Sequence, residues 1–345
     1  MSFPPASPGA PGDPGDRWPP PAATERRPGD APASAGIDPV AQLLPALSAG
    51  ARALRDPTAY LAALLVLALT LLPAALLWYL AASRTAALFM ADPFGPGGPG
   101  LERLIGGAGL LLFVTLLVGL VAFLGYLWTW MTLAVRAASL ERGAPLAVWA
   151  SVTVGLRRTV IAFGGWLVVL VLAIPVLVLY VLAQVMADVV VLSGVSVLLT
   201  IVVVVAVFAW WLGLLVITAM VGAIAAADRS ATLPVVLRRA VGLTLRHPAA
   251  VILVLIGAAV VASVLVTVLY VPTAFAGMAG FSVVGAMADG GRTVSAAVLG
   301  AVVAALLGIV LLLVPLSFTA SALAGFAVRV EPEFARIDAT RRTTR

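Results

Sequence analysis

The sequence predicts an all-α fold, a polytopic bundle of six transmembrane helices arranged as three hairpins, each preceded by a cytoplasmic amphipathic helix. Hydrophobic residues make up 62% of the 345 positions and charged residues only 10%, whereas a soluble domain is about half apolar and roughly a quarter charged. The apolar residues also fall into six separate runs, each long enough to cross a hydrocarbon core of about 30 Å as a helix. We therefore expect lipid to cover much of the surface.

The first 40 residues differ in composition from the rest of the chain. Proline, glycine, alanine and aspartate are abundant there, and so little apolar surface cannot offset the entropy lost on ordering. We expect a disordered cytoplasmic tail over 1–40, with a proline-rich partner-binding motif as the alternative. The transmembrane domain is then expected over 41–330, followed by an arginine-rich cytoplasmic tail over 331–345.

The six apolar runs give the expected membrane spans. A short stretch with Asp188 separates the third run from the fourth, and we place it in an external turn because a carboxylate is costly in hydrocarbon. None of the runs contains Asp, Glu, Arg or His. Proton relays, voltage sensors and ion-coupled carriers usually place such groups in their spans, so we do not expect those classes. The spans are 58–82, 104–135, 160–183, 193–226, 249–272 and 294–328.

Arginine is distributed unevenly between the two sides of these spans. The side that holds both termini has 18 of the 21 arginines, and the other side has Arg84, Arg103 and Arg292. By the positive-inside rule, both termini are expected in the cytoplasm. The net charge of +6 then reflects membrane topology, and we expect no nucleic-acid partner.

The chain contains no lysine, asparagine or cysteine. This usage suggests a GC-rich bacterial genome, so we expect the bacterial plasma membrane. The missing cysteine excludes a disulfide, a thiol nucleophile and Cys-ligated zinc within this sequence.

An internal repeat is visible at an offset of 87 residues. The segment 141–146 matches 228–233, and 154–156 matches 241–243. A fainter third copy lies before the first span, where 54–57 resembles 245–248. The repeat predicts three units in the same orientation, each a cytoplasmic helix followed by a membrane hairpin.

The segments before the second and third hairpins are expected to be helical. In 233–246, apolar residues recur at steps of three and four opposite the arginines, and 146–158 follows the same pattern more weakly. Basic amphipathic helices of this kind lie in the headgroup plane, so anionic lipid is one expected partner, and topology determination alone is the alternative. The candidate headgroup contacts are Arg157, Arg158, Arg238, Arg239 and Arg246.

Small residues and prolines mark places where the spans are expected to pack closely or bend. Small residues at a step of four allow helix backbones to approach, either within the monomer or across a dimer face. Prolines 73, 175 and 315 remove backbone hydrogen bonds inside spans, giving either a structural kink or a kink that lines a cavity. The stripe of small residues in the sixth span consists of Ala296, Gly300, Ala304 and Gly308.

The inventory of chemical groups gives no catalytic, metal or cofactor site. His247 is the single histidine, so it has no second histidine with which to share a metal and no serine–acid arrangement that would form a triad. Glu331 and Glu333 are interpreted as solvated charge near the C-terminus. We expect no enzymatic activity.

The run 235–248, VVLRRAVGLTLRHP, before a span, together with six spans and basic amphipathic segments, resembles a bacterial membrane-protein family. This family comprises the membrane domain of some glycerophosphoryl diester phosphodiesterases and stand-alone proteins of the YciC-like type. The resemblance covers roughly residues 40 to 330 and implies the six-span domain alone, since hydrolysis in such enzymes belongs to a separate soluble barrel.

Three functional hypotheses remain. The leading one is a non-enzymatic scaffold or accessory factor that contacts lipid headgroups or another membrane protein, or that forms a homo-oligomer. The second is a transporter or permease for an apolar or lipid-like solute, which needs no buried charge. The third is a lipid-modifying enzyme that uses a few polar groups near the membrane face, such as His247 or Asp228.

Overall fold

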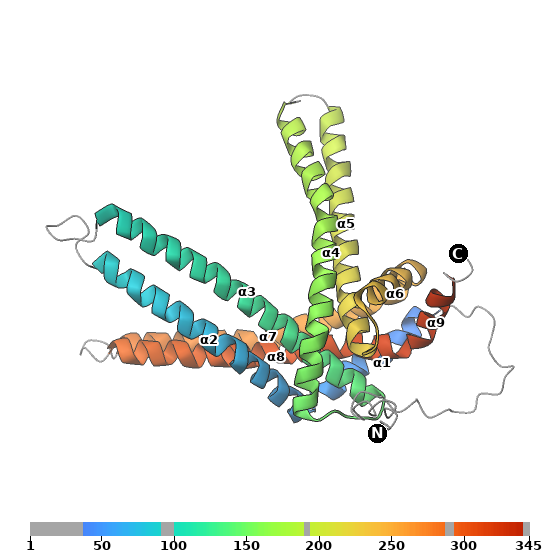
Figure 1. Ribbon diagram of the computed structural model, residues 1–345, viewed down its shortest axis with the longest axis horizontal. Helices are drawn as coiled ribbons and strands as arrows, with labels where there is room; N and C mark the ends of the chain where they lie inside the picture. The colour runs from blue at the N-terminus through green and yellow to red at the C-terminus, as the bar shows by residue number, and fades with distance from the viewer. Residues whose placement is uncertain (1–36, 91–99, 190–193, 287–292, 341–345) are drawn as a thin grey trace, which may run out of the picture. The chain divides into compact units, whose positions relative to one another are not determined.

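The computed structural model describes residues 37–90, 100–189, 194–286 and 293–340, which form nine α-helices and no strand (Figure 1). The predicted all-helical class is confirmed. The helices are α1 (Pro39–Ala53), α2 (Pro57–Met90), α3 (Gly100–Glu141), α4 (Val148–Val189), α5 (Gly194–Ala227), α6 (Leu233–Arg246), α7 (Pro248–Ala286), α8 (Thr293–Arg329) and α9 (Glu331–Thr340).

Six of these helices, α2, α3, α4, α5, α7 and α8, are long and apolar enough to span a membrane. The chain is therefore a multi-pass membrane protein. Consecutive pairs lie side by side as the hairpins α2/α3, α4/α5 and α7/α8 (Figure 1). Each of the six helices has 34 to 42 residues, whereas about 20 residues cross the hydrocarbon. Each helix is therefore longer than a perpendicular crossing of the hydrocarbon requires.

The helices continue past the expected ends of the spans. Arg136 lies within α3, and Arg157 and Arg158 lie within α4. The expected separate helix over 146–158 is therefore wrong, because 148–158 forms the first three turns of the long helix α4. Asp188, expected in a turn, lies near the end of the same helix. Backbone hydrogen bonding continues in water as well as in lipid, so apolar runs underestimate helix length.

Helix α1 starts inside the segment assigned to the tail. Asp38 caps it by accepting a hydrogen bond from the Val40 amide at 3.0 Å. Its buried face packs on α8, where a Cβ at Gly325 would lie only 2.6 Å from that of Ala49. A Cβ at Gly50 would lie 2.8 Å from the Phe318 ring. Glycine at both positions therefore allows the two backbones to approach.

The segment after α8 is not the solvated tail that the sequence predicted. Residues 331–340 form α9, and its Phe334 and Ile337 are buried. Ile337 packs against Gly242 of α6, where a Cβ would lie 3.0 Å from its side chain. The segment 331–340 has only ten residues, and its mixture of charged and apolar residues was not enough to distinguish a docked helix from a tail.

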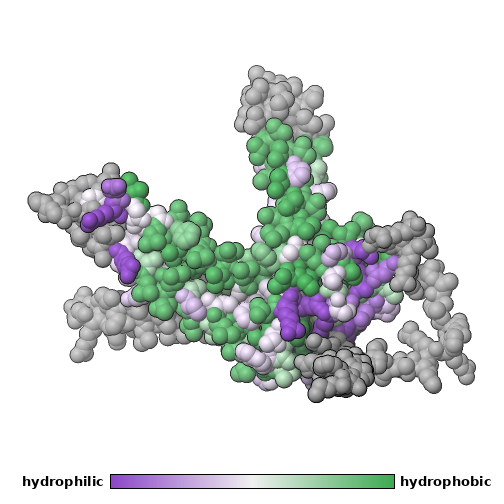
Figure 2. Space-filling view, in the orientation of Figure 1, coloured by the Kyte–Doolittle hydropathy of each residue, from purple (hydrophilic) through white to green (hydrophobic). Residues whose placement is uncertain are grey.

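Buried residues gather at one end of the hairpins. We call this end the base, and it comprises the last turns of α3, α5 and α8 together with α1, α6 and α9. Along the rest of the hairpins large apolar side chains are exposed, as lipid contact requires. Figure 2 shows polar side chains gathered over α6 and α9 and apolar side chains covering the α4/α5 hairpin. The largest side chains buried in the base are Met131, Leu133, Met220, Ile224, Leu243, Leu323, Phe326 and Phe334.

The predicted small-residue stripe of α8 is described only in part. Ala296, Gly300 and Ala304 belong to α8, but their side chains lie outside the described residues. At Gly308, no heavy atom lies within 4 Å of the position that a Cβ would take. The close approach seen in this helix therefore comes later, at Gly325.

Replacing Gly325 with leucine should lower the free energy of unfolding by about 1–3 kcal/mol, because the new side chain would overlap Ala49 of α1. Gly308→Leu is the matched control, since it adds the same side chain to the same helix in open space. Thermal unfolding in detergent measures both variants. Equal losses would show that α1 does not pack on α8 in this way.

Candidate functional site: the arginine–carboxylate network of the base

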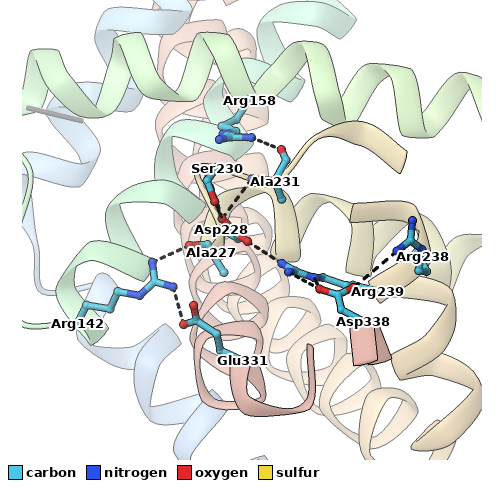
Figure 3. Close-up of polar contacts among 10 residues, drawn as sticks. All are labelled: Arg142, Arg158, Ala227, Asp228, Ser230, Ala231, Arg238, Arg239, Glu331 and Asp338. Carbon is cyan, nitrogen blue, oxygen red and sulfur yellow. Dashed lines mark hydrogen bonds and ion pairs between the residues drawn. The ribbon is translucent and has the colours of Figure 1, made fainter. Parts of the chain in front are cut away.

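Arg142 links all three hairpins at the base. It directly follows α3, and it donates one hydrogen bond to the carbonyl of Ala227, the last residue of α5, at 2.6 Å. It donates another at 2.6 Å to Glu331, which begins α9 just after α8 (Figure 3). Carbonyls at a helix C-terminus lack partners within the helix and carry partial negative charge. A guanidinium suits this position because it satisfies them and offsets their charge.

Glu141 makes a second link between the hairpins. This carboxylate, at the end of α3, is 11% exposed and accepts a hydrogen bond from Arg52 of α1 at 2.5 Å. Its other oxygen accepts a hydrogen bond from Arg329 at the end of α8, at 3.2 Å. Helices α1, α3 and α8 therefore meet at one acidic group.

Asp228 organises the turn after α5. One of its oxygens accepts hydrogen bonds from the backbone amide and hydroxyl of Ser230, at 2.9 and 2.7 Å. The other accepts from Arg239 of α6 at 2.6 Å (Figure 3). Burial alone would raise the pKa of this carboxyl, but the hydrogen bonds from Ser230 and Arg239 outweigh it and hold the pKa below the ordinary value of 3.8.

Arg239 connects that turn to α9. Its guanidinium also donates two hydrogen bonds to Asp338, at 3.0 and 2.7 Å, and lies over the Phe334 ring with 5.2 Å to the ring centre. Burial opposes the charge, but the hydrogen bonds to Asp338 and Asp228 raise the pKa of Arg239 above its ordinary value. The pairing fixes α6 between the end of α5 and α9.

Arg136 and Asp56 form the most buried ion pair of the network, with side chains 8% and 14% exposed. The guanidinium binds both carboxylate oxygens, at 2.6 and 3.3 Å, and donates to the Leu146 carbonyl at 2.7 Å. Asp56 also accepts from the Thr58 amide at 3.0 Å, at the start of α2. Burial disfavours the charged carboxylate, but these hydrogen bonds lower the pKa of Asp56 on balance.

The five predicted headgroup contacts fall into two groups. Arg158 is buried and donates to the Ala231 carbonyl at 2.8 Å, and Arg239 is engaged as described above. Arg157 and Arg246 are exposed, while Arg238 is about one-third exposed and lies 3.9 Å from Asp338. Arg157, Arg238 and Arg246 are therefore the members of the set that reach the surface.

Two further acidic groups that the sequence singled out, Glu331 and Glu333, also lie beside basic side chains. Glu331 binds Arg142, and Glu333 lies 3.7 Å from His247 with only 13% of its side chain exposed. The interpretation of Glu333 as solvated charge was therefore wrong, because α9 folds back on the base, whereas Glu331 keeps 47% of its side chain exposed. Among the described residues, no cluster of three or more His, Asp or Glu side chains has a metal-binding arrangement.

A second feature is an apolar cavity of about 420 Å³ within the spans, between α2, α3 and α8. It lies next to the base, and Pro315 of α8 is one of its lining residues. Its lining residues are Leu67, Leu71, Ala122, Tyr126, Thr129, Trp130, Leu312, Leu313, Pro315, Leu316 and Thr319.

Comparisons of this chain with protein-family models, with curated proteins and with solved structures found no match. The resemblance to the phosphodiesterase membrane domain therefore stays a prediction.

The low pKa of Asp228 predicts that the fold loses stability at acid pH. A carboxylate whose pKa is lower in the folded than in the unfolded chain stabilises the fold above about pH 3.8, and this stability is lost as the pH falls through the folded value. We expect a constant unfolding temperature from pH 7 to 5 and a fall below about pH 4.

Asp228→Asn should lower stability at neutral pH by about 1–3 kcal/mol and flatten the acid part of the profile. Glu102→Gln, at an exposed position of α3, is the control and should leave the profile unchanged. An unaltered profile in Asp228→Asn would contradict the role given to this carboxylate.

Proposed function

We propose that this protein is a non-enzymatic scaffold or accessory factor of the bacterial plasma membrane, with both termini in the cytoplasm. The arginine distribution supports this orientation, since it puts the base on the side with 18 of the 21 arginines. The fixed ion-paired base supports a scaffolding role. Its carboxylates hold helices together through arginine or backbone partners, which leaves them poorly suited to proton transfer.

The observation that carries the proposal is the surface arginine set at the base. Arg238 and Arg246 lie on α6, and Arg157 lies beside Arg158, which reaches the turn after α5. These three side chains are positioned by a rigid framework close to the expected membrane surface. Each is worth about 1 kcal/mol beside anionic lipid. Anionic lipid headgroups are the partner we favour. The alternative partners are an acidic surface on another membrane protein and a second copy of this chain.

A transporter or permease for a lipid-like solute is the second candidate function. The observation that favours it is the cavity between α2, α3 and α8, with Pro315 in its wall. A carrier needs a path between the two sides of the membrane, and this cavity lies next to the base at one end of the spans. We therefore keep the scaffold as the leading proposal.

Removing the three surface arginines should weaken the preference for anionic lipid. We would purify Arg157→Gln/Arg238→Gln/Arg246→Gln from mixed phosphatidylglycerol and phosphatidylcholine membranes and measure the ratio of the two co-purifying lipids. The enrichment of phosphatidylglycerol should fall by about fivefold or more. Arg84→Gln/Arg103→Gln, at the opposite ends of α2 and α3, is the control.

The unfolding temperature of each variant tests whether the fold is retained. Equal enrichment in the triple variant and the wild type would overturn the headgroup proposal.

A further inference from the structure

The cavity between α2, α3 and α8 is open to lipid on one side and closed by the base on the other. Leu312 is 62% exposed and Tyr126 is 50% exposed, whereas Thr129 is fully buried and Leu313 is 3% exposed. Met131 and Ala320, which directly follow the lining residues Trp130 and Thr319 in the sequence, are fully buried in the base. The cavity is therefore a blind pocket that continues inward from the lipid-facing surface.

Most of the residues that line the cavity are apolar. Thr129 donates to the Gly125 carbonyl and Thr319 to the Pro315 carbonyl, each at 2.8 Å. Both threonine hydroxyl protons are thus used within their own helices, and the other polar groups of the lining are the Tyr126 hydroxyl and the Trp130 indole N–H. Among the described lining residues none is charged, so a buried ionic group would find no counter-charge there.

Two local backbone features lie beside this cavity. At Gly125 a Cβ would lie 2.6 Å from the Thr70 hydroxyl, so α2 and α3 touch closely beside the pocket. On the facing helix α8, Pro315 lacks the backbone N–H that would donate a hydrogen bond to the preceding turn. The cavity of about 420 Å³ lies beside the α2/α3 contact and has Pro315 of α8 in its wall. This volume lies within the usual range of small-molecule sites, about 300–1,000 Å³.

We propose that this pocket binds one acyl chain of a membrane lipid, whose headgroup stays at the membrane surface. The lining is continuous with the exposed apolar belt of α2 and α3, so a chain already in the bilayer reaches it without crossing water. A free fatty acid is disfavoured because the lining residues that the structure describes include no cation for its carboxylate. This inference goes beyond the headgroup proposal and does not depend on Arg157, Arg238 or Arg246.

The test uses the full chain in phosphatidylcholine nanodiscs that contain a phosphatidylcholine with a diazirine in one acyl chain. After irradiation, mass spectrometry locates the labelled residues. Zwitterionic lipid keeps this test separate from that of the arginine surface. We expect labelling concentrated at 67–71, 122–130 and 312–319 relative to the lipid-facing stretch 167–182 of α4.

Ala122→Phe fills the pocket and should lower labelling of its lining by about fivefold or more, because the phenyl ring would occupy the space of the acyl chain. Leu120→Phe is the matched control, because it places a phenyl ring nearby on α3 at a side chain that is 49% exposed and outside the lining. Leu71→Trp fills the same space from α2 and replaces Ala122→Phe if that variant does not fold.

Two results would overturn the proposal. One is labelling spread evenly over all lipid-facing helices, with the pocket-filling variant equal to Leu120→Phe. The other is displacement of the label from the pocket by added palmitate but not by added phospholipid, which would assign the site to a free fatty acid.

Discussion

The arrangement of the hairpins depends on hydrogen bonds between arginine guanidinium groups and backbone carbonyls of the base. At the base, the C-terminal ends of α3, α5 and α8 present carbonyls that have no hydrogen-bond partner within their own helices. The same region buries arginines, whose charge requires a partner. Arg142 binds the carbonyl of Ala227 at the end of α5, whereas Arg158 and Arg136 bind carbonyls in the turns that follow α5 and α3, those of Ala231 and Leu146. Carboxylates bind the other N–H groups of two of these guanidiniums, Asp56 on Arg136 and Glu331 on Arg142, and thereby fix which helices meet.

This solution divides the molecule into two kinds of surface. The hairpins beyond the base expose large apolar side chains and gain little from packing on one another, because lipid is as apolar as they are. Polar contacts and small-residue packing in the base therefore determine how the hairpins meet. The proposed functions follow the same division, with arginines at the base for headgroups and an apolar pocket beside it for a chain.

Composition and periodicity were sufficient to predict the helical class, the six long apolar helices and the helix over 233–246. They failed where the structure depends on distant partners. Arg136 and Asp56 are 80 positions apart, and Arg142 and Glu331 are 189 apart, so no local pattern reveals either pair. The Glu–Arg and Asp–Arg pairs at 141–142 and 228–229 were the one visible signal of the network. The sequence also could not show that α9 docks, because its two anchors, Phe334 and Ile337, need α6 beside them.

A double-mutant cycle on Arg136 and Asp56 tests most directly whether buried ion pairs hold the base together. Unfolding free energies would be measured for Arg136→Met, Asp56→Asn and the double variant. The pair is buried and doubly hydrogen-bonded, so we expect each single variant to be strongly destabilised and the coupling energy to be about 1–3 kcal/mol. Losses that add to within about 0.5 kcal/mol would contradict this account.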